Sequence, residues 1–110
     1  MELIKSNNGL VGLEKTIVYL AMKGGTYQER FGYAATIGGI SVVLHRKEGG
    51  AWHITDPGTG LALPWYGKTR KAALEQLTPD RLETVRRALA SGVARSQRLR
   101  LAEYLSTHAE

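Results

Sequence analysis

The chain has 110 residues, of which 43% are hydrophobic and 23% charged, and its formal net charge is +5 at pH 7. This composition is typical of a globular chain of one-domain size and excludes disorder as a description of the whole molecule. The sequence has no cysteine, which excludes disulfides, thiolate metal sites and cysteine nucleophiles.

The start of the chain and its hydropathy favour a cytoplasmic location. Residues 1–5 lack the apolar core of a signal peptide. The longest apolar run, at residues 17–22, is too short to span a bilayer. We therefore expect a protein with no membrane partner, and nothing in the sequence indicates a cofactor.

The first predicted element is a helix over residues 8–23. Asn8 can cap its start, and Gly24-Gly25 supplies the left-handed residue that ends many helices. Gly12 and the β-branched Val18 favour the alternative, a pair of strands. The apolar residues that recur at helical spacing are Leu10, Leu13, Ile17, Leu20 and Ala21.

A polar connector at residues 26–32 leads into three or four short β-rich runs, the first of them a short strand over residues 33–37. Turn signals separate these runs at Gly38-Gly39, at residues 48–50 and at residues 56–60. The pattern predicts an antiparallel β-meander.

The loop length between two of these strands determines which side chains share a face. A three-residue loop at residues 48–50 pairs Leu44 with Ile54, whereas a two-residue loop would pair Leu44 with the polar His53. The three-residue loop makes His45 and His53 cross-strand neighbours on the more polar face. The predicted apolar face consists of Ile40, Val42, Leu44, Trp52, Ile54, Leu61, Leu63 and Trp65.

The remainder of the chain is predicted to be helical. Thr69 caps a short helix over residues 70–77, and Thr78-Pro79-Asp80 combines three helix-start signals. Ser91-Gly92 separates the second helix from a last one over residues 93–107. The expected fold is one α+β domain over residues 1–110: an N-terminal helix, a three- to four-stranded antiparallel β-meander, and two to three C-terminal helices packed on one sheet face.

Positive charge is concentrated between Lys68 and Arg100, where the sequence has nine basic and three acidic residues and thus a local charge of +6. Such a field attracts phosphate backbones or acidic protein surfaces, although arginines also solvate the outer faces of helices. The cations that we expect to contact a partner are Lys68, Arg70, Lys71, Arg86, Arg87, Arg95, Arg98 and Arg100.

His45 and His53 are further candidate contacts, exposed on the polar sheet face. Two cross-strand imidazoles need a third ligand to hold zinc, so we predict no metal site there. The catalytic motifs of serine hydrolases, zinc proteases and P-loop enzymes are absent, so we predict a non-enzymatic protein with no catalytic residues. Trp52 and Trp65 are predicted to pack in the core rather than stack on bases.

Three segments, at residues 52–56, 59–61 and 67–73, together resemble a strand–turn–strand–helix pattern found in small proteins and accessory domains of phages and plasmids. The resemblance covers about a fifth of the chain and implies a mobile-element origin. Small proteins of this origin often act against host defence, as anti-CRISPR and anti-restriction proteins do. The expected partner is then a defence or nucleic-acid-processing complex of a bacterial host, inhibited by stoichiometric occlusion.

An alternative is a small basic regulator of DNA or RNA that contacts phosphates through the same arginines. The charge pattern alone does not choose between the two. A regulator is expected to lose affinity log-linearly with salt, whereas an inhibitor with an apolar interface centre is expected to keep most of its affinity.

Overall fold

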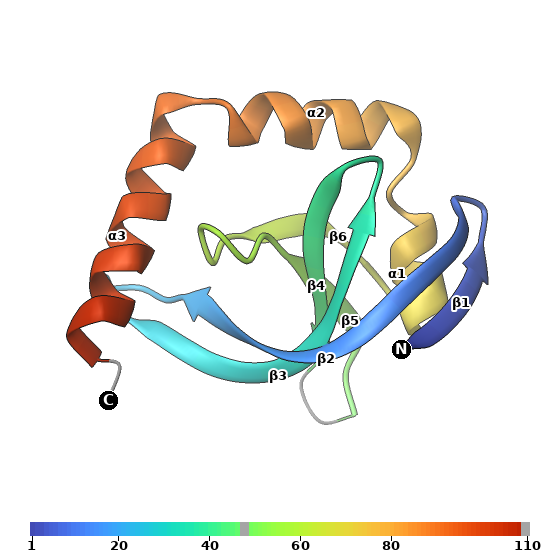
Figure 1. Ribbon diagram of the computed structural model, residues 1–110, viewed down its shortest axis with the longest axis horizontal. Coiled ribbons are helices and arrows are strands. Elements are labelled where there is room, and N and C mark those ends of the chain that lie inside the picture. Colours follow the sequence, from blue (N-terminus) through green and yellow to red (C-terminus); the bar gives the residue numbers. More distant parts are fainter. Residues whose placement is uncertain (47–48, 109–110) are drawn as a thin grey trace.

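A computed structural model describes residues 1–46 and 49–108. Six antiparallel strands pair in chain order: β1 (Glu2–Ser6), β2 (Gly9–Ala21), β3 (Tyr27–Ile37), β4 (Ile40–Arg46), β5 (Trp52–Thr55) and β6 (Ala62–Gly67). Three helices follow them: α1 (Arg70–Glu75), α2 (Pro79–Leu89) and α3 (Gly92–His108). In Figure 1, α1 and β1 lie at one end of the sheet, α3 lies at the other, and α2 spans the distance between them.

The expected N-terminal helix is wrong, and so is the three- to four-stranded meander. Residues 8–23 contain the whole of β2, and the predicted connector at residues 26–32 contains the first half of β3. Strand β2 buries Val11 and Leu13 on one face of the sheet but Val18 on the other. Because the buried face changes, the apolar residues of this strand are not all two positions apart, and their spacing resembles that of a helix.

The predicted pairing of β4 with β5 is confirmed, since Leu44 lies opposite Ile54 and His45 opposite His53. Part of the predicted three-residue loop, at residue 48, lies outside the described residues. Thr69 and Thr78 cap α1 and α2 as predicted, each accepting a hydrogen bond from a backbone N–H three residues later. Pro79 is the first residue of α2, also as predicted.

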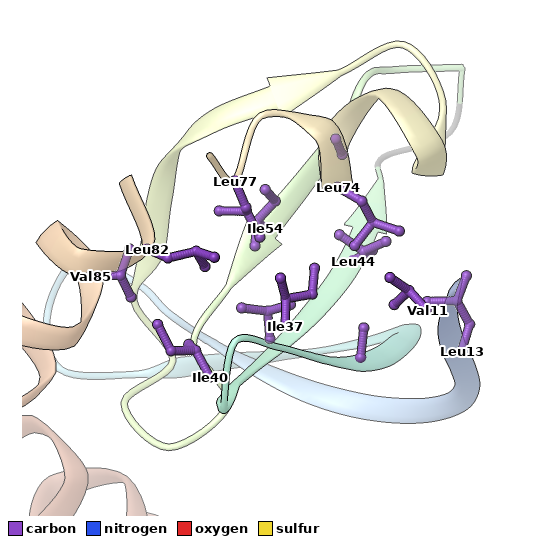
Figure 2. Close-up of a cluster of buried hydrophobic side chains, with 13 residues drawn as sticks. Val11, Leu13, Ile37, Ile40, Leu44, Ile54, Leu74, Leu77, Leu82 and Val85 are labelled. Atoms are coloured by element: carbon purple, nitrogen blue, oxygen red, sulfur yellow. The ribbon is translucent and has the colours of Figure 1, made fainter. Parts of the chain in front are cut away.

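The main core lies between one face of the sheet and the helices α1 and α2 (Figure 2). Leu44 and Ile54 at its centre are fully buried, and Leu74, Leu77, Leu82 and Val85 cover them from the helical side. Trp52 and Trp65 are half-buried at its edge, which agrees with the prediction that both belong to the apolar face. Successive side chains of a strand point to opposite faces of the sheet, so a residue two positions beyond a core residue lies on the same face as the core.

The loop between β5 and β6 ties back to the far end of β2. The backbone N–H of Ala21 donates to the carbonyl of Gly60 at 2.8 Å. Asp56 stabilises this loop, because its carboxylate accepts from the backbone N–H of Thr59 at 3.0 Å and from its hydroxyl at 2.7 Å. Within residues 1–46 and 49–108, no helix is both long enough and apolar enough to cross a membrane.

Candidate functional site

An open groove continues the core face of the sheet beyond the end that α1 covers. Register places Lys15 opposite Tyr33 and Arg46 opposite Trp52, and these residues lie two positions beyond the buried Leu13, Ala35, Leu44 and Ile54. The groove has a volume of about 370 Å³. We call it the aromatic groove, and its lining residues are Lys15, Phe31, Gly32, Tyr33, Arg46 and Trp52.

Aromatic rings form the apolar part of this groove. Phe31 is 80% exposed, although it lies within the regular strand β3. The rings of Tyr33 and Trp52 are half-buried and tilted by 54°, with their centroids 5.9 Å apart. Tyr33 and Trp52 pack against the core, whereas Phe31 does not.

Cations surround these rings. The guanidinium of Arg46 lies 5.0 Å from the centroid of the Trp52 ring, and that of Arg70 lies 4.5 Å from the Tyr33 ring. Lys15 and Arg46 are both exposed. Since the positive charges lie against ring faces, each can interact with the negative face of the aromatic system.

Arg70 also ties the end of the sheet to α1. Its guanidinium donates to both carboxylate oxygens of Glu2, at 2.9 and 2.5 Å. This hydrogen bonding lowers the pKa of Glu2 and raises the pKa of Arg70. Arg70 was predicted to be a partner contact, and the structure gives it a local structural partner as well.

Five cations gather at this end of the molecule, and we call them the basic end. Gly67 lies opposite Trp52, so that Lys68 directly follows the groove and Lys71 lies in the first turn of α1. Both lysines are exposed. Among the described carboxylates, Glu2 is the one that forms an ion pair with this group. The basic end consists of Lys15, Arg46, Lys68, Arg70 and Lys71.

The helical arginines that the sequence singled out lie away from the groove, and several make intramolecular bonds. Arg86 forms an ion pair with Glu83 and donates to the carbonyl of Gly38 at 3.0 Å. Arg98 donates to the carbonyl of Leu89 at 2.8 Å and thereby joins α3 to the end of α2. These two side chains therefore have structural roles of their own.

The remaining candidates on α2 and α3 are more open. The side chain of Arg87 is 81% exposed and lies 3.5 Å from Glu83. Arg95 and Arg100 are exposed, as predicted, and Arg100 borders a shallow hollow beside Gly25 and Tyr104. The structure does not bring these three residues together with the basic end.

The two histidines have different environments, and the expectation that both are exposed is wrong for one of them. His53 is exposed and stacks between His45 and Tyr66, with ring centroids 6.1 and 5.8 Å away. His45 is buried, and its Nε2 lies 2.6 Å from the hydroxyl oxygen of Thr55. Burial lowers the pKa of His45 to about 4, and the positive charges of His53 and Arg30 contribute to the decrease.

The sequence prediction missed Lys15 and Arg46 as candidate contacts, and it placed Phe31 in a connector rather than in a strand beside the core. The signal that could have found them is the alternation of Phe31, Tyr33, Ala35 and Ile37 along one strand, which places an aromatic pair next to the core positions. The expected connector at residues 26–32 concealed this alternation.

The described part of the chain holds no cluster of three or more His, Cys, Asp or Glu side chains able to bind a metal. The site is thus a basic, aromatic surface groove on an antiparallel α+β fold. No family model matches the chain, and comparisons with curated proteins and with solved structures find no similar protein.

Proposed function

We propose that the protein is a non-enzymatic nucleic-acid-binding protein that contacts phosphates through its basic end. The observation that supports this proposal is that Lys15 and Arg46 line one groove and Arg70 lies over the Tyr33 ring of that groove, while Lys68 and Lys71 are the chain neighbours of Gly67, which lies opposite Trp52, and of Arg70. Clustered cations of this kind release counterions from a nucleic-acid backbone, and this release supplies much of the binding free energy.

The charge balance of the whole structure agrees with this role. Fourteen of the fifteen Lys and Arg residues lie in the described part of the chain, and three of these form ion pairs there. A surface whose cations outnumber their carboxylate partners keeps a positive potential that attracts polyanions over several ångströms.

The test is the salt dependence of binding to a labelled oligonucleotide, measured by fluorescence anisotropy between 50 and 200 mM KCl. We expect the logarithm of the association constant to fall linearly with the logarithm of the salt concentration. Lys71→Glu and Lys15→Glu should weaken binding to all sequences alike and make the salt dependence less steep.

Arg95→Glu is the matched control, because it makes the same charge change on α3, at the opposite end of the molecule (Figure 1). Weaker binding of the two lysine variants than of Arg95→Glu supports the basic end. An equal or larger loss of affinity in Arg95→Glu would indicate that α2 and α3 contact the nucleic acid instead. Absence of binding at 50 mM KCl would refute the proposal.

A second candidate is stoichiometric inhibition of a host defence complex, in the manner of an anti-CRISPR protein. The observation that favours it is an apolar hollow of about 290 Å³ between β6, α2 and α3, beside Val93, which is 70% exposed. Leu61 and Leu63 line the same hollow. A partially open apolar pocket can hold the anchor residue of a protein partner.

This candidate is tested by capture of the tagged protein with a purified CRISPR effector complex after nuclease treatment. Retention of the complex at 300 mM salt, and its loss in Val93→Asp, would support inhibition. Retention that is lost on nuclease treatment would support nucleic-acid binding through the basic end instead.

A further inference from the structure

The aromatic groove has features that phosphate binding alone does not require. Phosphate contacts need cations, yet Phe31 presents a phenyl ring that is 80% exposed and lies in contact with the groove. An exposed aromatic ring gains none of the free energy that burial would give it. Its position beside two further rings therefore indicates a binding surface for a ligand with a flat apolar face.

We propose that the aromatic groove binds unpaired bases, so that the preferred ligand is single-stranded nucleic acid. This inference rests on the proposed function and specifies its substrate class. Bases stack on aromatic side chains through their π faces, and these faces are covered by neighbouring bases in a duplex. A groove that offers ring faces therefore discriminates by strandedness rather than by sequence.

The three rings lie on one face of the sheet, and the guanidinium of Arg70 covers part of this surface, 4.5 Å from the centroid of the Tyr33 ring. Phe31 and Tyr33 lie two residues apart on β3 and thus on the same face of the sheet, and Trp52 projects from β5 beside Tyr33, with 5.9 Å between centroids. Because β-strand positions and the core below fix Tyr33 and Trp52, little side-chain entropy is lost when a base stacks against them.

The charges lie where a sugar–phosphate backbone needs them. Lys15 lies on β2 opposite Tyr33, Arg46 lies on β4 between the strands that carry Phe31 and Trp52, and the guanidinium of Arg70 lies 5.8 Å from the centroid of the Trp52 ring. Among the described residues that line the groove, none carries a carboxylate. The volume of about 370 Å³ lies at the small end of the roughly 300–1,000 Å³ range of ligand sites, as expected for one or two bases on an open platform.

Arg46 already covers one face of Trp52, at 5.0 Å from its centroid. A stacked base either displaces this guanidinium toward the phosphates or stacks on the guanidinium plane itself, and both arrangements occur in single-strand recognition. In either case the fluorescence of Trp52 reports occupancy of the groove.

The first experiment compares the affinities of labelled 15-nucleotide dT and rU strands with that of a 15-base-pair duplex. Phe31→Ala should weaken binding of the single strands, since one base–ring stack contributes a factor of roughly 5 to 150. Phe31→Trp should restore the affinity. Tyr66→Ala is the matched control, because Tyr66 is a 61% exposed aromatic residue outside the groove.

A second readout is independent of affinity. In a Trp65→Phe background, Trp52 is the one remaining tryptophan of the chain, and we expect its emission to be quenched as the dT strand saturates the protein. The salt dependence of Phe31→Ala should match that of the parent protein, because the substitution removes no charge.

The outcomes separate this inference from the proposed function. Equal affinity for duplex and single strands, or an unchanged affinity in Phe31→Ala, would refute base stacking while leaving phosphate binding in place. A preference for rU or dT alone identifies the source of the strand, RNA or DNA, and supports the groove. Absence of binding to all three probes would refute both proposals.

Discussion

At the residue scale, His45 is a buried side chain whose ionisation affects stability. It is 6% exposed and bonded to Thr55, and its pKa is lowered to about 4. A lowered pKa means that the unfolded chain binds a proton more readily than the folded chain at pH values between about 4 and 6.5. Stability that is fully present above pH 6.5 is therefore lost as the pH falls toward 4.

This effect predicts a measurable difference between variants. Urea unfolding from pH 4 to pH 7 should give a steeper loss of stability for the parent protein than for His45→Gln, with a difference of at most about 3 kcal/mol across the range. His108→Gln, which changes an exposed imidazole on α3, is the control and should follow the parent curve. Parallel curves for all three proteins would contradict the role of His45.

Gly60 supports a second prediction at this scale. Its φ is +76°, and an added Cβ would lie 2.5 Å from the backbone oxygen of Tyr19. Gly60→Ala should lower the free energy of unfolding by more than about 2 kcal/mol, because it combines a left-handed conformation with a backbone clash. Gly39→Ala is the matched control: its φ is +80° with nothing within 4 Å. Equal losses in thermal unfolding would show that the close approach to β2 is unimportant.

At the element scale, Asn8 connects the β1–β2 hairpin to α1. Its side-chain amide donates to the carbonyls of Leu74 and Leu77, each at 3.2 Å, at the end of a helix of six residues. Asn8→Ala should cost about 1–2 kcal/mol, since two part-buried carbonyls lose a donor. The neighbouring Asn7→Ala, which truncates an exposed side chain, should cost less than about 0.5 kcal/mol. Chemical denaturation of both variants gives the comparison.

The elements differ in how far the sequence could predict them. The helix starts at Thr69 and Thr78 were predictable because capping is a local interaction between residues three apart. The pairing of β4 with β5 was predictable because a one-residue slip would expose Leu44 or Ile54. Strand β2 was not predictable in this way, because its buried face changes between Leu13 and Val18, which breaks the regular alternation of a strand.

At the scale of the whole molecule, the candidate site depends on contacts that no local pattern contains. The sequence indicated a basic region at residues 68–100, and Lys68, Arg70 and Lys71 belong to the basic end. Lys15 and Arg46 join them only because six strands bring residues 15, 33, 46 and 52 into adjacent register positions. Strand pairing thus brings Lys15 and Arg46 into the basic end, whereas the positions of the arginines on α2 and α3 are set by the helices that carry them.

The last prediction concerns the cooperativity of the fold. Helix α3 lies at the end of the molecule opposite α1 (Figure 1), and its buried residues are Ala94 and Leu101. Tyr104 adds a tilted ring contact to Tyr27 of β3, with 4.8 Å between centroids. With so few anchors, we expect α3 to open in a local fluctuation whose free energy is below that of global unfolding.

Hydrogen exchange followed by mass spectrometry tests this expectation. Amides in the last turns of α3 should exchange about 2- to 13-fold faster in Tyr104→Ala than in the parent protein, because an aromatic pair contributes about 0.5–1.5 kcal/mol beyond its buried area. Amides of β4 should keep their rates, and Leu99→Ala, an exposed position on the same helix, should change neither set. If α3 and β4 amides exchanged together in every variant, the helix would instead belong to the same cooperative unit as the sheet.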